Sequence, residues 1–233
     1  MNALELDDVW KFYGDFPALR QISFQVPRGA CLALLGRNGA GKTTLLRILS
    51  GLMRATRGAV RVLNADPRDG AARSRIGVLG HGLALYDELS ALENLTLFAR
   101  LYGFNDARAV ARAWLERVGL AASAASLVRE FSRGMRQRLA VARAFLHQPE
   151  VLFLDEPFTA LDDRAVTTLQ DLLREAVREG RTVVLSTHQL REALGLATHV
   201  ALLVRGRRAY FGPRTDEMLE DPGWLYRRYG EAT

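Results

Sequence analysis

The residues best suited to chemistry begin with a glycine-rich stretch that ends in lysine and threonine. Residues 36–43 read Gly-Arg-Asn-Gly-Ala-Gly-Lys-Thr, a spacing that lets backbone N–H groups surround phosphate oxygens. The Lys42 ammonium would reach the β- and γ-phosphates, and the Thr43 hydroxyl would ligate Mg²⁺. Because an apolar run precedes the loop and leucines at helical spacing follow it, the context is the strand, loop and helix that this motif requires. The predicted phosphate-binding residues are Gly36, Arg37, Asn38, Gly39, Ala40, Gly41, Lys42, Thr43 and Thr44.

Two adjacent carboxylates far downstream supply the second half of such a site. The apolar run at residues 151–154 ends in Asp155 and Glu156. A buried strand would deliver Asp155 to the Mg²⁺ shell, and Glu156 would hold and polarise the attacking water. An acidic pair after a strand is often only a helix cap, but together with the phosphate loop it indicates catalysis of phosphoryl transfer. We therefore predict catalytic roles for Glu156 and Lys42.

The elements that must position these residues follow from apolar spacing. Short alternating strands separated by Gly and Pro turns are predicted at residues 4–9, 22–26 and 59–63, as in an antiparallel meander. Apolar residues recur at three- and four-residue spacing from about residue 87 to 145, which predicts helices. The later apolar runs, at 151–154, 182–185 and 200–204 with a helical stretch at 164–179, predict buried parallel strands.

Length and pattern predict a single α/β domain over residues 1–233, since the chain is long enough for one large core. In this prediction residues 1–86 and 148–233 form the nucleotide-binding α/β core with its antiparallel β subdomain. Residues 87–147 form a helical subdomain that carries the turn described below.

The composition and charge of the chain limit its expected binding partners and cellular compartment. The net charge is +6, carried almost wholly by arginines scattered along helices, and the only lysines are Lys11 and Lys42. Scattered charge is typical of a solvated surface, and a basic face could suit an anionic membrane surface, so a nucleic-acid partner is not expected. No window approaches the roughly 20 apolar residues needed to span a bilayer, and the first residues lack a signal-peptide layout. Together with the single cysteine, Cys31, inside an apolar run, this predicts a cytoplasmic chain with a buried reduced thiol.

These motifs, in this order, resemble the ATP-binding subunits of ABC transporters along nearly the whole chain. The resemblance implies a P-loop NTPase (RecA-like) core with an N-terminal antiparallel β subdomain and an inserted α-helical subdomain. It implies that Tyr13 stacks on adenine and that Asp162, in Thr-Ala-Leu-Asp, crosses a dimer interface. His188, in Ser-Thr-His, would contact the γ-phosphate and order the Glu156 region. The implied cofactors are ATP and Mg²⁺.

The turn at residues 131–138 reads Phe-Ser-Arg-Gly-Met-Arg-Gln-Arg and resembles the signature turn of that family. There Ser132 would cap the next helix and present its positive end to the γ-phosphate held by the opposite subunit. The resemblance implies nucleotide contacts from Ser132, Arg133 and Gly134, with two copies of the chain closing on ATP. The usual Leu-Ser-Gly-Gly-Gln has changed, however, and His81 stands where the family places a glutamine that senses Mg²⁺ and water. His81 is retained as a predicted nucleotide and metal contact.

With these changes in the signature turn and with His81, the sequence resembles the ATP-binding subunit of the cytochrome c maturation heme exporter. That sub-family implies a peripheral ATPase on the cytoplasmic face of the inner membrane, bound to an integral membrane permease near residues 81–93 and to a second ATP-binding subunit. Another exporter, for a drug, lipid or polysaccharide, is the alternative, because the ATPase chain need not contact cargo. A soluble ATPase acting on nucleic acid or ribosomes would carry coiled coils or a second ATPase copy, and a regulatory module would lack a catalytic group; the sequence favours neither.

Overall fold

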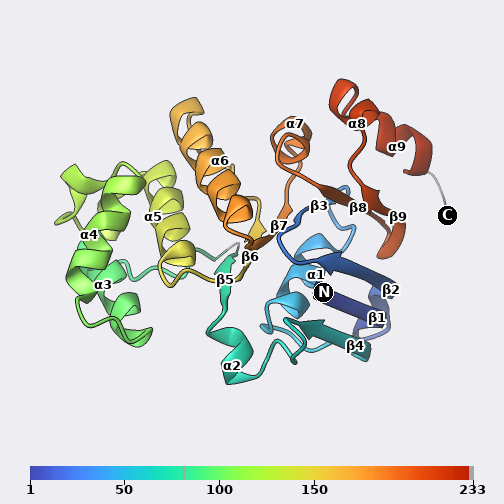
Figure 1. Cartoon of the computed structure of the whole chain (residues 1–233), viewed down its shortest axis with the longest axis horizontal. Coiled ribbons are helices and arrows are strands. Elements are labelled where there is room, and N and C mark those ends of the chain that lie inside the picture. Colours follow the sequence, from blue (N-terminus) through green and yellow to red (C-terminus); the bar gives the residue numbers. More distant parts are fainter. Residues whose placement is uncertain (81, 231–233) are drawn as a thin grey trace.

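Within residues 1–80 and 82–230, which the computed structural model describes, the strands form two sheets (Figure 1). The smaller sheet is antiparallel, with strand order β2-β1-β4, and contains β1 (Asn2–Tyr13), β2 (Phe16–Pro27) and β4 (Arg57–Val62). The predicted antiparallel pairing is confirmed, but the meander order is wrong, because β4 pairs with β1 and not with β2. The chain passes through another strand and a helix after β2, and it then returns to the opposite edge of β1.

The larger sheet has the order β5-β6-β7-β3-β8-β9. Its strands are β3 (Cys31–Leu35), β5 (Ile76–Leu79), β6 (Val151–Asp155), β7 (Thr182–Ser186), β8 (His199–Val204) and β9 (Arg207–Pro213). All neighbours pair in parallel except β8 with β9. Every residue of β3, β6 and β7 is buried, as expected for parallel strands covered on both faces. The buried Cys31 thiol has its pKa raised to about 12 by desolvation.

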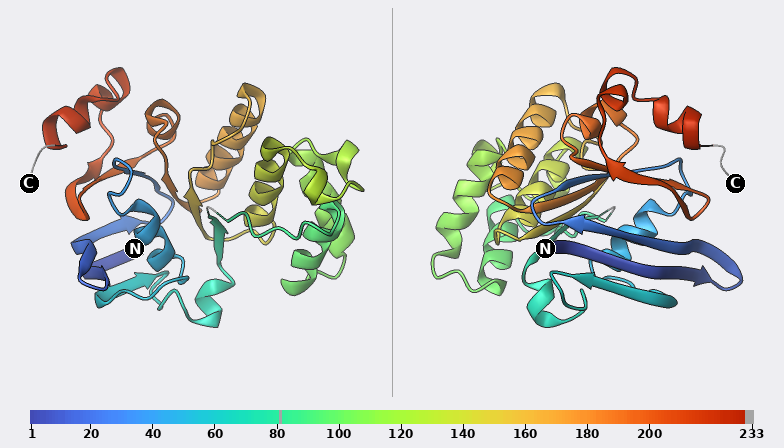
Figure 2. Two further views of the ribbon diagram at one scale, coloured as in Figure 1. Left: turned by 180° about the vertical axis from the view of Figure 1, so that it is seen from behind. Right: turned by 45° about the vertical axis from the view of Figure 1, so that its right-hand side comes forward.

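Helices cover both faces of this sheet and extend it at one end (Figure 2). They are α1 (Lys42–Leu49), α2 (Gly70–Arg73), α3 (Ala91–Leu101), α4 (Ala107–Arg117), α5 (Arg133–Phe145), α6 (Asp163–Arg178), α7 (Leu190–Leu194), α8 (Asp216–Glu220) and α9 (Trp224–Tyr229), with 3-10 turns at Ala121–Ser123 and Val128–Glu130. Helices α3, α4 and α5 lie together at one end of the molecule, whereas α8 and α9 lie at the other (Figures 1 and 2). No helix in these described ranges is long and apolar enough to cross a bilayer.

Short signals in the sequence set the helix boundaries near the site. Ser90 begins α3 with a capping box, in which its hydroxyl accepts from the Glu93 N–H and the Glu93 carboxylate accepts from the Ser90 N–H. Helix α1 ends at Leu49, before the left-handed Gly51, where a Cβ would lie 2.2 Å from the Pro67 carbonyl oxygen. The helix ends there because the chain must turn at Gly51.

Several elements were not predicted from the sequence. Strand β5 has only four residues, one of them the glycine Gly77, and β9 is an edge strand of exposed and half-buried residues. The C-terminal helices α8 and α9 are also short. Such elements carry too few periods of apolar spacing to be detected, although the tertiary structure holds them firmly.

The sheet topology brings the predicted chemistry to one edge. Strands β3, β6 and β7 are parallel, so their carboxyl ends meet there. Asp155, at the end of β6, is in register with Ser186 at the end of β7. The glycine-rich loop leaves the end of β3 at the same edge, and thus three segments far apart in sequence converge on one cavity.

Candidate nucleotide site

A cavity of about 720 Å³ lies at this edge of the larger sheet. Its walls come from the glycine-rich loop, the ends of β6 and β7, the tip of the β1–β2 hairpin and the start of α5. The lining residues are Tyr13, Phe16, Ala18, Asn38, Gly39, Ala40, Gly41, Lys42, Thr43, Thr44, Gly80, Leu83, Arg133, Gln137, Asp155, Glu156, Thr159 and His188. A volume of this size is typical of pockets for small organic ligands.

The glycine-rich loop is shaped by two positions where a side chain would not fit. Gly36 has φ of 153°, and a Cβ there would lie 2.7 Å from the Leu203 carbonyl oxygen. Gly41 has φ of 103°, and its Cβ would lie 2.7 Å from a Leu19 methyl group. Both glycines therefore let the loop approach neighbouring strands closely. The loop passes directly into α1, whose N-terminal N–H groups form the end of the cavity.

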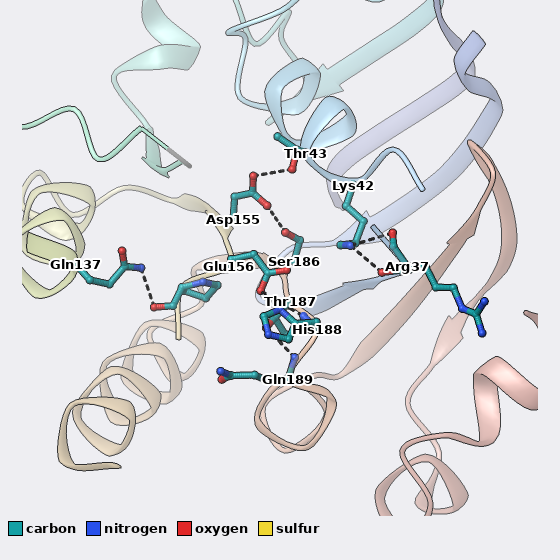
Figure 3. A network of polar contacts seen from close by, with 12 residues as sticks. Arg37, Lys42, Thr43, Gln137, Asp155, Glu156, Ser186, Thr187, His188 and Gln189 are labelled. Atoms are coloured by element: carbon teal, nitrogen blue, oxygen red, sulfur yellow. Dashed lines mark hydrogen bonds and ion pairs between the residues drawn. The ribbon is translucent and has the colours of Figure 1, made fainter. Parts of the chain in front are cut away.

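Lys42 lies at the base of this loop and is almost fully buried, with 7% of its surface exposed. Its Nζ donates to the carbonyl oxygen of Gly36 at 2.7 Å and to that of Arg37 at 3.4 Å (Figure 3). Burial lowers the pKa of Lys42 from its ordinary value, while the negative charges of Glu156 and Asp155 oppose this shift. The ammonium is held by carbonyl groups that a phosphate could replace, and it points along the cavity floor.

Oxygen atoms beside Lys42 are suitable ligands for a magnesium ion. The Thr43 hydroxyl donates to one oxygen of Asp155 at 2.8 Å, and the Ser186 hydroxyl donates to the other at 2.5 Å (Figure 3). A hydroxyl and a carboxylate are hard oxygen ligands of the kind Mg²⁺ prefers when substrate phosphates and waters complete its shell. Among residues 1–80 and 82–230, no three His, Cys, Asp or Glu side chains group together as metal ligands. The residues present therefore suit a cation that a nucleotide brings with it.

Glu156 occupies a strained position directly after β6. Its φ is 52°, in the left-handed region that a non-glycine residue rarely adopts. Its carboxylate accepts from the backbone N–H of His188 at 3.3 Å and lies 2.9 Å from the His188 Nδ1 (Figure 3). The backbone strain turns the carboxylate toward the cavity, and His188, which is largely exposed, fixes its direction.

The turn at the start of α5 reaches the cavity from the helical side. Ser132 caps α5 as the sequence predicts, its hydroxyl accepting from the Met135 N–H at 3.2 Å. Gly134 packs so closely on the segment after Glu156 that a Cβ would lie 2.9 Å from the Ala160 carbonyl oxygen. Gln137, which is buried, donates to the Pro157 carbonyl oxygen at 3.0 Å (Figure 3). Within one chain, the turn therefore touches the segment that carries Glu156.

Two aromatic side chains form the far rim. Tyr13 and Phe16 pair across the β1–β2 hairpin, and both are substantially exposed. The Tyr13 hydroxyl donates to the Met53 sulfur at 3.2 Å, and the Lys11 ammonium lies 5.5 Å from the Tyr13 ring centre. Exposed flat rings beside a phosphate-binding loop can stack on a heterocyclic base.

Some of the predicted site residues line the cavity and others do not. Five of the predicted residues that the structure describes do not line it: Gly36, Arg37, Ser132, Gly134 and Asp162. Asp162 instead caps α6, its carboxylate accepting from the Ala165 N–H at 2.8 Å. His81 lies outside the described residues. The predicted roles of these residues in contacts with nucleotide, metal or a second subunit stay predictions.

Sequence reasoning missed several residues of the site. Phe16 and Thr159 line the cavity, Gln137 joins α5 to the segment after Glu156, and Ser186 orients Asp155. The Ser186 position could have been found, because it follows from the register of two parallel strands that both end at the site. The others depend on contacts between distant segments, for which the sequence carries no local signal.

Comparisons with known proteins agree with this geometry. The family model described as ABC transporter matches residues 19–159. The chain is similar to a daunorubicin resistance ATP-binding protein of Streptomyces coeruleorubidus, with 45% identity over 88% of this chain and 66% of that protein. It is also similar to a Nod factor export ATP-binding protein of Cupriavidus metallidurans, with 38% identity over 88% of this chain and 69% of that protein. The chain thus spans about two thirds of the length of these relatives.

A solved structure gives the same result for the fold. It is described as a dimeric, post-hydrolysis state of an ATP-binding cassette bound to ADP and Pi. The TM-score is 0.84 at 26% identity, over 91% of this chain and 99% of that one. The predicted α/β fold is thereby confirmed.

Proposed function

The chain belongs to the ABC transporter family and is an ATPase of that family, and we propose that it is the ATP-hydrolysing subunit of a membrane exporter. The observation that carries the proposal is the convergence of Lys42, Thr43, Asp155 and Glu156 on one cavity. These are a phosphate-binding cation, a pair of hard oxygen ligands and a carboxylate directed at open space. Together they supply the positioning and charge stabilisation on which phosphoryl transfer depends.

Each residue has a separate role in the proposed reaction. The loop N–H groups and the Lys42 ammonium bind the phosphates, and Tyr13 stacks on adenine. Thr43 and Asp155 would hold Mg²⁺, which would supply positive charge to offset that of the phosphates. Glu156 orients a water molecule for attack on the γ-phosphorus and accepts its proton. His188 holds the Glu156 carboxylate and contacts the γ-phosphate, and His81 is retained as a nucleotide and metal contact.

Two copies of the chain complete the site in this proposal. Ser132, Arg133 and Gly134 of one copy would bind the γ-phosphate held by the loop of the other, and Asp162 would cross between them. This is supported by the position of Ser132 at the positive end of α5 but outside the cavity of its own chain. A solved neighbour is described as dimeric. ATP binding closes the pair, and hydrolysis with phosphate release reopens it.

The proposed membrane partner is an integral permease that docks near residues 81–93. The chain would then act as a peripheral subunit on the cytoplasmic face of the inner membrane, with its arginines near anionic lipid. No nucleic acid takes part in this proposal. The net charge of +6 is distributed over the chain and gives no single basic groove in the sequence.

The cargo is better matched by the exporter alternative than by heme. Relatives at 45% and 38% identity carry names referring to daunorubicin resistance and Nod factor export. The heme-export hypothesis depends on the altered signature turn and on His81, which belong to the ATPase machinery and not to a cargo site. We therefore propose export of an organic molecule of the drug, lipid or polysaccharide type, and we keep heme as an outcome of the test.

The test combines a trapped variant with identification of its partners. Glu156→Gln should bind ATP, accumulate as a dimer and lose ATP turnover by about a hundredfold or more, because the amide cannot accept the proton. Glu179→Gln, at a surface position paired with Arg181, is the matched control and should hydrolyse ATP normally. Turnover near the wild-type level in Glu156→Gln would contradict the assigned role.

The same trapped variant, tagged and expressed in its own host, identifies the partner after gentle membrane extraction. Recovery of a permease without heme-handling proteins supports the exporter proposal. Recovery of heme-handling proteins would overturn the cargo proposal, and recovery of ribosomes or nucleic acid would overturn the membrane assignment.

A further inference from the structure

We infer that Tyr226 is a positioning residue for the phosphate loop, through which the C-terminal helix α9 sets the affinity for nucleotide. The inference rests on the proposed ATPase function, and it adds a residue that lies 190 positions from the loop it contacts.

The contact is a hydrogen bond to the first residue of the loop. The Gly36 N–H donates to the Tyr226 phenol oxygen at 2.9 Å. Gly36 has a φ that other residues rarely adopt, and it is pressed against the Leu203 carbonyl group. Its N–H therefore has a fixed direction, and Tyr226 is its partner across the fold. Burial raises the pKa of Tyr226, so the phenol is neutral at ordinary pH and accepts through its oxygen lone pair.

Tyr226 does not line the nucleotide cavity. A second cavity, of about 230 Å³, is lined by the Tyr226 side chain and by Leu203 and Arg205. Asn38, Gly39 and Ala40 line both this cavity and the nucleotide cavity. The middle of the loop thus borders two cavities. It is held by hydrogen bonds, among them the bond from the Gly206 N–H to the Ala40 carbonyl oxygen at 3.1 Å and the bond from the Gly36 N–H to Tyr226.

Hydrogen bonds link Tyr226 to Lys42 through a single residue. The N–H of Gly36 is held by Tyr226, and the carbonyl oxygen of the same glycine accepts from the Lys42 ammonium at 2.7 Å. Rotation at Gly36 would move the carbonyl group that positions Lys42. Because glycine has no Cβ to restrict such rotation, loss of the phenol oxygen should loosen both the loop and the lysine.

Helix α9 is anchored well enough to act as a support. Leu225, next to Tyr226, is fully buried, as is Met218 of α8, and both belong to the main hydrophobic core. Through Tyr226, the position of the loop is therefore fixed relative to the core. A shift of α9, for example by a partner bound to the C-terminal helices, would change nucleotide affinity by the same route.

The experiment compares two variants that each lose one phenol oxygen. Tyr226→Phe keeps the ring and removes the bond to Gly36, whereas Tyr210→Phe removes a bond to the Pro213 carbonyl oxygen within the same C-terminal region. Hydrogen exchange of the peptide containing Gly36 is measured without nucleotide, and binding of a fluorescent ATP analogue is measured by titration. Exchange should rise several-fold in Tyr226→Phe only. Its Kd for nucleotide and its KM should rise about two- to tenfold, with kcat changed much less.

Replacement of Tyr226 by 3,5-difluorotyrosine separates positioning from packing. Because the fluorines make the phenol more acidic, the measurement is made at a mildly acidic pH at which it stays neutral. The oxygen is then a weaker acceptor, and the affinity should fall between those of the wild type and of Tyr226→Phe. Unchanged exchange at Gly36, unchanged affinity, or an equal loss in Tyr210→Phe would overturn the inference. If the wild-type chain failed to bind ATP, the proposed function would fail, while the exchange measurement without nucleotide would still decide whether Tyr226 holds the loop.

Discussion

The phosphate loop and the signature turn, which face each other across the cavity, are held in different ways. The loop joins a fully buried strand to a helix and is fixed by bonds to three other segments, through Asp155 to Thr43, Tyr226 to Gly36 and Gly206 to Ala40, and by its own Lys42. The turn lies at the start of α5, where Ser132 and Arg133 are exposed. It contacts the core through the buried Phe131, through Gln137 and through the close approach at Gly134. The loop half of the site is therefore fixed within a single chain, and we expect the turn half to be movable together with the helices α3–α5.

The largest loss of ATP turnover is expected when the Lys42 ammonium is removed from the phosphate loop, the fixed half of the site. Lys42→Ala removes a buried cation that the proposed mechanism directs at the β- and γ-phosphates. ATP turnover should fall by about a hundredfold or more, because the phosphate charge would have no direct partner in a site sheltered from water. Coupled-assay turnover and a binding titration with ATP measure the two consequences.

Lys11→Ala is the matched control, since it removes the other lysine of the chain. Lys11 donates to the Arg54 carbonyl oxygen on an exposed edge and lies beside the Tyr13 ring. Its loss can therefore weaken binding of the base, but it should leave kcat within about twofold, because Lys11 does not line the cavity that would hold the phosphates. Similar losses in both variants would show that net charge, and not the position of Lys42, controls the rate.

A smaller effect is expected in the movable half. Gly134→Ala places a Cβ within 2.9 Å of the Ala160 carbonyl oxygen, and the turn or the segment after Glu156 must shift. We expect a tenfold to hundredfold loss of turnover, because displacements of about 1 Å in a catalytic arrangement have such effects. ATP binding to the single chain should stay near normal, since the phosphate loop is not touched.

Gly70→Ala is the control for this substitution, because a Cβ there meets nothing within 4 Å. It should hydrolyse ATP at the wild-type rate. Should Gly134→Ala instead weaken ATP binding as strongly as turnover, the two halves would be more tightly coupled than the contrast implies.

The same contrast explains how much of the molecule could be predicted from sequence. The convergence of the fixed half follows from the sequence, because a contiguous motif specifies its loop and the parallel-strand rule brings the carboxyl ends of β3 and β6 to one edge; the roles of its residues stay predictions. The Mg²⁺ pairing of Thr43 with Asp155 stays a prediction, yet the 2.8 Å contact between them follows from that rule. Tyr226, Gln137 and Phe16 were missed because each acts through a contact between segments whose separation in sequence has no pattern.

The order of the strands in the smaller sheet and the identity of the cargo could not be predicted from the sequence, for different reasons. Strand β4 could pair with either edge of the β1–β2 hairpin by its apolar pattern alone, and only the path of the intervening chain decides for β1. The cargo is harder, because the residues on which the sub-family resemblance rests are predicted to contact nucleotide or a permease and not the cargo. A signature turn reports how ATP is used, and it carries little information about what is transported.

The smallest effect concerns the junction where α3 and α5 meet the larger sheet. The His147 ring stacks on Tyr102 with ring centres 3.9 Å apart, and its Nε2 donates to the Ile76 carbonyl oxygen at 3.0 Å. Its Nδ1 is buried with no hydrogen-bond partner among the described residues. Burial, aided by the positive charges of Arg143 and Arg181, lowers the pKa of His147 to about 4, although the bond to Ile76 opposes the shift.

The sign of the pH effect follows from that lowered value. Between the ordinary histidine pKa, about 6.5, and the folded value, about 4, the unfolded chain binds the proton and the folded chain does not. The free energy of unfolding should therefore decrease as pH falls through this window, and the effect should be absent above pH 7. The full shift corresponds to about 3 kcal/mol, which solvent near the half-buried ring reduces to about 1–2 kcal/mol.

Urea unfolding of the wild type and of His147→Phe at pH 7 and pH 5 measures this contribution. Phenylalanine keeps the stack on Tyr102 and cannot titrate. As the pH falls from 7 to 5, the wild type should therefore lose more unfolding free energy than the variant. Because the ring joins α5 to α3 and to β5, its protonation should loosen the movable half first. Hydrogen exchange at pH 5 should then rise in α3 and α5 more than in the phosphate loop; an equal rise in both would mean that the two halves are held alike.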